Sequence, residues 1–275
     1  MTDKLTQKQQ DELFATLQSA TQQTQDIRAE KTKLNNPAIN LSNDELFNHH
    51  VKWADWKPLQ NHGLNDTSIN INAEDMDWPM QVRAYLNLVK DIDIENKTIA
   101  DIGCGWGRGV DAIKKYHNAN ITGIDNNLSY IQYANQHYPN NEFICANTVT
   151  DDYDIIISNC SAHLLMEGTF FYTRYRTVIL TDFFTRTSIN EFKDRILANG
   201  FCKIVNEVDL SEQTVQAMMY DIDTIDKRFP NISQHSRNIF KDIAISRLHL
   251  FRMGANRQYK YCLLAPILNK CSLLI

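Results

Sequence analysis

Apolar residues along the middle of the chain follow two different periods, one typical of strands and one typical of helices. Short apolar runs predict strands at 97–102, 120–124, 142–145, 153–158 and 176–182. Apolar positions three to four residues apart predict helices at 79–90, 108–117, 128–137 and, shorter, near 162–172. Strands that alternate with helices in this way are typical of an α/β protein whose parallel sheet is covered by helices on both faces.

The pattern continues through the C-terminal third. It predicts a helix that ends at Asn199-Gly200 and a strand over 201–208. Two helices at 212–228 and 233–253 follow, and a last strand at 259–264 is expected to be antiparallel. The predicted fold is therefore a doubly wound, mostly parallel sheet with an antiparallel last strand and a C-terminal helical insertion.

The N-terminal part has a different character. Residues 3–35 are polar and rich in glutamine, and Leu13 and Leu17 lie four positions apart. This spacing favours a weakly amphipathic helix that covers the edge of the main domain, with a partly disordered arm as the alternative. Residues 38–80 lack periodicity, and their aromatic side chains either form a lid or pack against the core. We predict a helical or irregular cap over 1–78 and one main domain over 79–268.

Composition narrows the possible partners and compartment. The 275 residues are 43% hydrophobic, and the net charge of −5 argues against a nucleic-acid partner. We see no apolar run of membrane-spanning length and no signal-peptide pattern, so we expect a cytoplasmic protein without a membrane partner. The six cysteines are scattered and form no C-x-x-C pair, which indicates reduced thiols and no metal site.

The chemistry centres on the end of the first strand of the main domain. There the sequence reads Asp101-x-Gly103-x-Gly105-x-Gly107 and continues into a helix. Glycines allow a sharp turn and let a ligand approach the backbone closely, and the helix directs its positive end toward that ligand. A dinucleotide-binding G-x-G-x-x-G loop requires a third glycine at position 108, but this position holds Arg108.

Polar residues follow the other predicted strands. Asp125 comes 22 residues after Gly103, which is where a ribose-binding acid belongs. The next strands end near Asn147, at Asn159 with His163 shortly after, and at Asp182. In such sheets the carboxyl ends of the strands meet in one cleft. A carboxylate beside an imidazole is a plausible general base for a hydroxyl, so His163 and Asp182 are the candidate catalytic residues.

The D-x-G-x-G-x-G loop together with Asp125 resembles the class I S-adenosylmethionine-dependent methyltransferases, which have a Rossmann-like fold. The resemblance implies S-adenosylmethionine as cofactor and S-adenosylhomocysteine as product. It implies that the three loop glycines approach the methionine part and that Asp101 lies on its ammonium side. Asp125 is expected at the ribose and Asn147 at the adenine, where the family usually has an acid. The expected cofactor-binding residues are Asp101, Gly103, Cys104, Gly105, Gly107, Asp125, Asn126, Asn147 and Asn159.

A closer resemblance links residues 101–109, 158–163 and 181–184 to O-methyltransferases of natural products such as sugars and polyketides. In the sugar enzyme of that group, the positions of His163 and Asp182 hold the proposed base pair. The family usually has a longer connection ending L-K-P-G-G before the fifth strand. Here the connection Leu164–Thr177 is shorter, with Gly168 as its single glycine and with no proline.

These observations predict methyl transfer from S-adenosylmethionine to a hydroxyl of a small molecule, a secondary metabolite by the resemblance (EC 2.1.1.-). The alternatives are an N- or C-methyltransferase of a small molecule and a cofactor-binding protein without catalysis. We expect no metal cofactor. The partners are expected to be a small-molecule acceptor and no nucleic acid or membrane; the sequence leaves a homodimer open.

Overall fold

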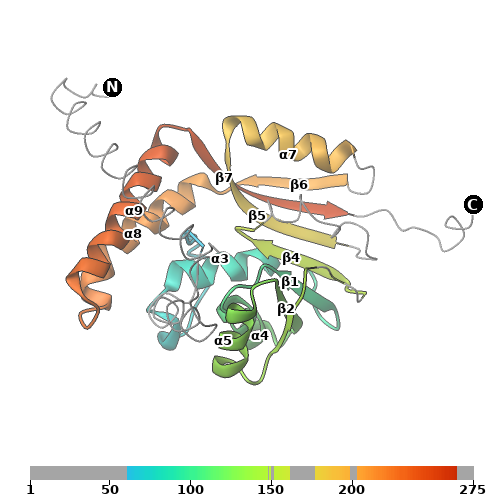
Figure 1. Cartoon of the computed structure of the whole chain (residues 1–275). Coiled ribbons are helices and arrows are strands. Elements are labelled where there is room, and N and C mark those ends of the chain that lie inside the picture. Colours follow the sequence, from blue (N-terminus) through green and yellow to red (C-terminus); the bar gives the residue numbers. More distant parts are fainter. Residues whose placement is uncertain (1–60, 148, 150–151, 162–176, 199–202, 265–275) are drawn as a thin grey trace, which may run out of the picture.

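The computed structural model describes residues 61–147, 149, 152–161, 177–198 and 203–264, and these form one seven-stranded sheet (Figure 1). The strands are β1 Thr98–Ile102, β2 Asn120–Asp125, β3 Glu142–Cys145, β4 Ile155–Asn159, β5 Thr177–Thr185, β6 Lys203–Asp209 and β7 Asn256–Leu264. The helices are η1 Ala73–Asp75, α3 Pro79–Val89, α4 Arg108–His117, α5 Leu128–His137, α7 Arg186–Ala198, α8 Ser211–Arg228 and α9 Gln234–Arg252.

The strand order confirms the predicted fold class. Across the sheet the order is β3-β2-β1-β4-β5-β7-β6, with β1 to β5 parallel and β7 antiparallel to both of its neighbours. The chain first builds the sheet outward from β1 and then crosses to β4 on the other side. The order therefore reverses between β1 and β4, which is where open α/β sheets form ligand-binding crevices.

Several strand boundaries differ from the prediction. β5 continues to Thr185 and β7 begins at Asn256, because the two pair along their whole length, from Thr177 with Leu264 to Thr185 with Asn256. β4 begins at Ile155, two residues later than predicted. The reason is Asp154, whose Oδ2 accepts hydrogen bonds from the backbone N–H and the hydroxyl of Thr98 at 3.0 and 3.1 Å. These bonds set the start of the strand.

Helices cover both faces of the sheet, as the alternation of elements predicts. One core joins Ile99, Ile157 and Ile179 of the strands to apolar residues of α3, α4, α8 and α9. The other core joins Ala100, Val178 and their neighbours to Phe192 of α7. Neighbouring residues of one strand thus belong to opposite cores, as the pleat requires. In Figure 1, α8 and α9 lie side by side at the end of the molecule remote from α4 and α5.

The segment 61–78 packs against α4 and against the C-terminal helices α8 and α9. Asp75 is 2% exposed and accepts hydrogen bonds from Lys115 at 3.0 Å, from Tyr116 at 2.7 Å and from Arg108, all on α4. Trp78 packs against Phe229 and Phe240 beside the C-terminal helices. Packing onto the core, one of the two predicted roles, is therefore confirmed for Trp78.

Other expectations for the N-terminal part lie outside the described residues. They concern the helix over 3–35 and the aromatic residues before position 61. The short helix predicted near 162–172 also lies outside the described residues. The boundary between residues 78 and 79 stays a prediction.

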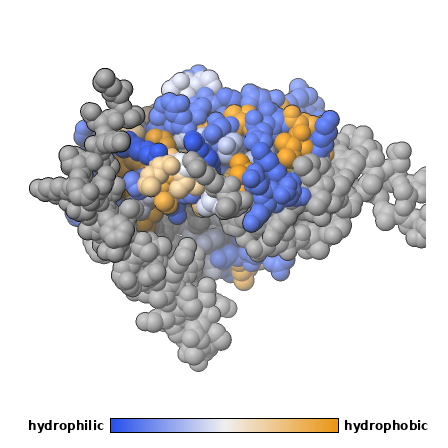
Figure 2. Space-filling model, turned by 90° about the horizontal axis from the view of Figure 1, so that it is seen from above, coloured by the Kyte–Doolittle hydropathy of each residue, from blue (hydrophilic) through white to orange (hydrophobic). Residues whose placement is uncertain are grey.

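On the face shown in Figure 2, hydrophobic residues occupy separate patches between hydrophilic ones. Within the described ranges, no helix has the length and apolar character needed to span a membrane.

Gly109 decides how closely α3 and α4 pack. A Cβ at this position would lie 2.1 Å from two ring carbons of Tyr85, a buried residue of α3. Replacing a helical glycine by alanine ordinarily stabilises a protein by up to about 1 kcal/mol. We expect Gly109→Ala to destabilise this one by about 1–3 kcal/mol, the usual cost of overpacking, in urea unfolding.

The double variant Gly109→Ala/Tyr85→Ala is the control. Because it removes the ring that the new methyl group would meet, its loss of stability should be at least about 1 kcal/mol smaller than the sum of the two single losses. Strict additivity would show that the contact does not explain why position 109 is glycine.

Candidate functional site

The loop between β1 and α4 contains three glycines in the left-handed region, with φ values of +76° at Gly103, +56° at Gly105 and +83° at Gly107. A Cβ on Gly103 would lie 2.5 Å from Oγ of Ser161, and one on Gly107 would lie 2.7 Å from Cβ of Ala134. A Cβ on Gly105 would meet no described atom within 4 Å. Gly103 and Gly107 are therefore required for packing within the protein, whereas Gly105 faces open space.

Asp125, at the end of β2, holds this loop in place. Its Oδ2 accepts a hydrogen bond from the backbone N–H of Gly105 at 3.0 Å, and its Oδ1 accepts one from Asn127 at 2.9 Å. The backbone N–H of Gly103 donates to the carbonyl of Ile124 at 2.8 Å. Burial raises the pKa of Asp125, and the backbone hydrogen bonds oppose that rise. The predicted ribose-binding acid thus also fixes the shape of the glycine loop.

The other predicted cofactor residues near the loop differ in accessibility. Cys104 is buried, and burial raises the pKa of its thiol well above the usual value. Its Sγ lies 2.9 Å from the point where a Cβ on Gly123 would stand, so the side chain packs against the sheet. Asn126 and Asn147, after β2 and β3, are exposed. Access to a ligand is therefore open for these two side chains.

Asp101 is the least expected feature of the site. Its side chain is fully buried, and neither carboxylate oxygen has a hydrogen-bond partner within the described part of the chain. Burial, with a smaller contribution from the charge of Asp125, raises the pKa of Asp101 to about 8. A buried carboxylate is stable only when a cation or hydrogen-bond donor partners it. Asp101 therefore fits a cationic ligand group behind the glycine loop, such as an ammonium.

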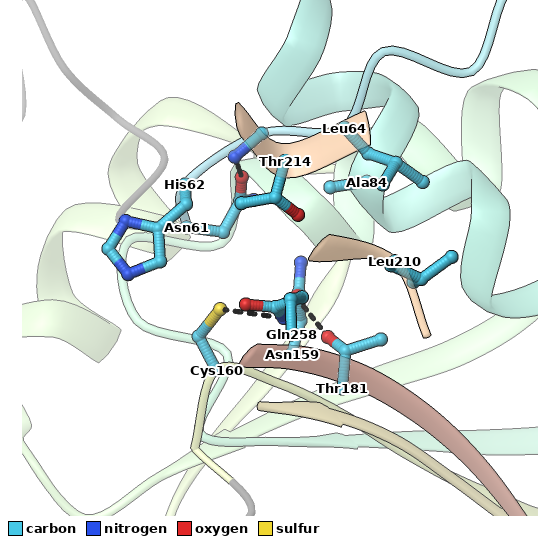
Figure 3. Close-up of a pocket in the computed structure, with 11 residues that line it drawn as sticks. Asn61, His62, Leu64, Ala84, Asn159, Cys160, Thr181, Leu210, Thr214 and Gln258 are labelled. Carbon is cyan, nitrogen blue, oxygen red and sulfur yellow. Dashed lines mark hydrogen bonds between the residues drawn. The ribbon is translucent and has the colours of Figure 1, made fainter. Parts of the chain in front are cut away.

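A pocket lies at the end of β4 and beside the middle of β5 (Figure 3). Its floor is formed by residues of β4, β5 and β7, and its roof by the segment around Gly63 together with the start of α8. The lining residues are Asn61, His62, Gly63, Leu64, Ala84, Asn159, Cys160, Thr181, Leu210, Thr214 and Gln258. Elements far apart in the sequence thus build one compartment over β4, β5 and β7, next to the point where the strand order reverses.

Asn159 belongs to this pocket, although the resemblance places it at the cofactor. Its Oδ1 accepts a hydrogen bond from the hydroxyl of Thr181 at 2.6 Å. The next residue, Cys160, adopts a positive φ of +60° and receives a hydrogen bond from Nε2 of Gln258 at 3.9 Å. Burial, and secondarily the charge of Asp182, raises the pKa of Cys160 to about 12. Its thiol is therefore protonated near neutral pH and is a poor nucleophile.

Of the two predicted catalytic residues, the structure describes only Asp182. Asp182 of β5 is 2% exposed, and its Oδ1 accepts a hydrogen bond from the N–H of Phe183 at 2.9 Å. It follows Thr181, which lines the pocket, so the strand pleat directs Asp182 toward the opposite face of the sheet. His163 lies outside the described residues, and the proposed contact between the two stays a prediction.

Among the residues that line the pocket, sequence reasoning named only Asn159 as a site residue, and it missed Thr214, Gln258 and His62 in particular. Thr214 and Gln258 can be recognised only from the structure, because each is a polar residue that the fold buries. His62 gives no signal in the sequence, since it lies in a segment without periodicity. Its ring packs edge-on against Phe183 with centroids 5.2 Å apart, and its Nδ1 lies 3.2 Å from Nη1 of Arg247. An imidazole that the sequence did not reveal therefore lines the pocket.

Comparison with known proteins identifies the domain. Residues 99–178 match the model of a methyltransferase domain family. A putative methyltransferase, 235L, of Invertebrate iridescent virus 6 is 32% identical over 95 residues, which are 32% of this chain and 36% of that protein. This part of the chain is thus similar to a methyltransferase domain. S-adenosylmethionine is the cofactor that this similarity supports. The match spans about a third of the viral protein's length.

Solved structures agree on the fold. A putative sarcosine dimethylglycine methyltransferase from Galdieria sulphuraria matches with a TM-score of 0.58 and 12% identity, covering 78% of this chain and 97% of that one. The O-methyltransferase of a trans-AT PKS multienzyme from Brevibacillus brevis, solved with S-adenosylhomocysteine, matches with a TM-score of 0.53 and 15% identity, covering 70% and 74%. Other neighbours are named as C- or N-methyltransferases. At such identities the likeness concerns the fold alone.

No group of three or more candidate metal ligands occurs among the residues that the structure describes. The polar groups of the site fall into two sets, Asp101 and Asp125 around the glycine loop and the side chains that line the pocket. Two carboxylates thus stand at the glycine loop, whereas the pocket is lined by no aspartate, glutamate, lysine or arginine.

The raised pKa of Asp101 predicts how stability depends on pH. Between its ordinary value of 3.8 and about 8, the folded chain holds a proton that the unfolded chain has lost. This residue therefore makes stability fall as pH rises through that window, with no further loss above it. We expect Asp101→Asn to remove the loss, so that its stability advantage over the natural chain in urea unfolding grows from pH 5 to pH 8.

Asp93→Asn serves as the matched control because Asp93 is exposed. Its stability should run parallel to that of the natural chain over the same pH range. If the stability of Asp101→Asn also ran parallel to that of the natural chain between pH 5 and pH 8, Asp101 would not hold a proton in the folded protein.

Proposed function

We propose that this protein transfers a methyl group from S-adenosylmethionine to a hydroxyl of a small molecule, in the cytoplasm and in secondary metabolism. One observation carries the cofactor part: a fully buried carboxylate without a described partner, Asp101, stands behind the loop in which Gly105 faces open space. The match of residues 99–178 to a methyltransferase domain supports it.

The residues fit the cofactor. The ammonium group of S-adenosylmethionine would supply the positive partner that Asp101 lacks, and the open space at Gly105 would admit its methionine part. Asp125 keeps lone pairs for the ribose hydroxyls beside its two backbone hydrogen bonds, and the exposed amide of Asn147 is available to the adenine. When bound, S-adenosylmethionine supplies an electrophilic methyl group on its sulfonium.

The chain's own residues then have three tasks. The glycine loop fixes the position of the donor, and the neighbouring pocket holds the acceptor in line and excludes water, which accounts for most of the acceleration in such transfers. The third task is removal of the hydroxyl proton, which we assign to His163 with Asp182 as the residue that orients it. In support, β4 and β5 pair in register at Asn159 and Thr181, so the chain leaves β4 beside Asp182 only four residues before His163.

Binding of S-adenosylhomocysteine tests the cofactor assignment. We expect calorimetric titration to show binding to the natural chain and at least a tenfold weaker affinity for Asp125→Ala, equivalent to about 1.4 kcal/mol, because the variant loses two backbone hydrogen bonds and the proposed ribose contact. The control, Asp93→Ala, removes an exposed aspartate that also accepts one backbone hydrogen bond, at 3.0 Å from Glu95. Equal affinity in all three proteins would remove Asp125 from the site.

Turnover tests the base. In a screen of alcohols, phenols and amines with S-adenosylmethionine, we expect His163→Ala to lower turnover of a hydroxyl acceptor by about 10²–10⁴-fold while the affinity for S-adenosylhomocysteine stays unchanged. His62→Ala is the matched control, because it removes the other imidazole of the region. Loss of turnover in His62→Ala alone would transfer the role of base to His62, and methylation of amines alone would favour an N-methyltransferase.

A further inference from the structure

Three buried polar side chains of the pocket each have an atom without a hydrogen-bond partner in the described ranges. These atoms are Nδ2 of Asn159, Oγ1 of Thr214 and Oε1 of Gln258. The three residues are only 7%, 0% and 5% exposed. Buried polar atoms are almost always paired, since an unpaired one lowers stability. Three such atoms around one pocket therefore form a polar site that a ligand group or a water molecule can satisfy.

Other contacts fix the orientation of these side chains. The amide of Asn159 is held by Thr181 at 2.6 Å, and that of Gln258 by Cys160 at 3.9 Å. The backbone N–H of Gln258 also donates to Oγ of Ser211 at 2.9 Å. In Figure 3 the amides of Asn159 and Gln258 rise from the sheet toward Thr214. The set comes from β4, α8 and β7 and is thus preorganised around the pocket.

The rest of the lining limits what can enter. Leu64, Ala84 and Leu210 form an apolar cluster on the side of the pocket opposite His62 (Figure 3). The lining contains no aspartate, glutamate, lysine or arginine. Arg247 contacts His62 from outside this set. A charged group would therefore find no aspartate, glutamate, lysine or arginine among the residues that line the pocket, and burial without such a partner is unfavourable.

We propose that this pocket binds an uncharged polar group of the methyl acceptor that both donates and accepts hydrogen bonds, a hydroxyl or a carboxamide on a short apolar portion. The group accepts from Asn159, donates to Gln258 and shares a hydrogen bond with Thr214, while its apolar portion lies against Leu64. Rotation of either amide exchanges donor and acceptor and keeps the pocket uncharged. The assignment of this group to an acceptor rests on the proposed function.

Four probes of one shape test the proposal: isobutyramide, isobutanol, isobutyrate and isobutylammonium. Their binding is measured by protein NMR titration of the full chain, with and without saturating S-adenosylhomocysteine. We expect the two neutral probes to bind at least tenfold more tightly than the two ions. Equal affinities of the four, or no binding of any probe, would overturn the assignment.

Thr214→Val links the probes to the pocket. Valine keeps the shape of threonine but lacks its hydroxyl, so we expect at least a fivefold loss of isobutyramide affinity together with a melting temperature raised by about 2–4 °C, because a buried unpaired hydroxyl disappears. The control is Thr224→Val on the same helix, whose hydroxyl donates to the carbonyl of Tyr220 at 2.6 Å outside the pocket. It should leave probe affinity unchanged. A lowered melting temperature of Thr214→Val with unchanged affinity would give Thr214 a structural role only and contradict the proposal.

The two proposals fail in distinguishable ways. Binding of S-adenosylhomocysteine without selectivity among the probes overturns the neutral-group assignment and leaves the proposed function standing. Selective binding of neutral probes to a folded protein that does not bind S-adenosylhomocysteine overturns the proposed function, and with it the role of the pocket as an acceptor site.

Discussion

The hydrogen bond from the backbone of Gly105 to the carboxylate of Asp125 is the interaction on which the site depends. It ties the glycine loop after β1 to the end of β2 and thereby decides where the open space at Gly105 lies. The loop can take this course because its glycines have positive φ, and because Gly103 and Gly107 let Ser161 and Ala134 pack closely against it. The strand order then brings the end of β4 beside the loop.

The two compartments on either side of this junction differ in their electrostatics. Around the loop, Asp101 and Asp125 are both acids with a raised pKa, and the charge of Asp125 helps to keep Asp101 protonated. In the pocket, buried amides and a hydroxyl take their place, and the nearest thiol, Cys160, keeps its proton. Under the proposed function, a cationic donor and an uncharged acceptor would bind at separate places near the carboxyl ends of the parallel strands.

Local patterns in the sequence predicted the first half of the domain well. β1, the glycine loop, α4 and β2 are continuous in the chain, so period and turn chemistry are enough to place Asp101, Gly105 and Asp125. Where pairing partners are remote, prediction was less accurate: β5 and β7 lengthen each other over positions that neither segment reveals alone. The pocket depends still more on tertiary structure, since His62, Thr214 and Gln258 come together only after the sheet and α8 have formed.

The segment 61–78 has a consequence for how this domain can change over evolution. It supplies a wall of the pocket through Leu64, yet it also buries Asp75 against Arg108 in the first turn of the helix that follows the glycine loop. The pocket and the glycine loop are therefore not separate modules. A lineage that exchanged this segment for another, to accept a new substrate, would have to preserve an acid at position 75 or replace the basic residues that face it.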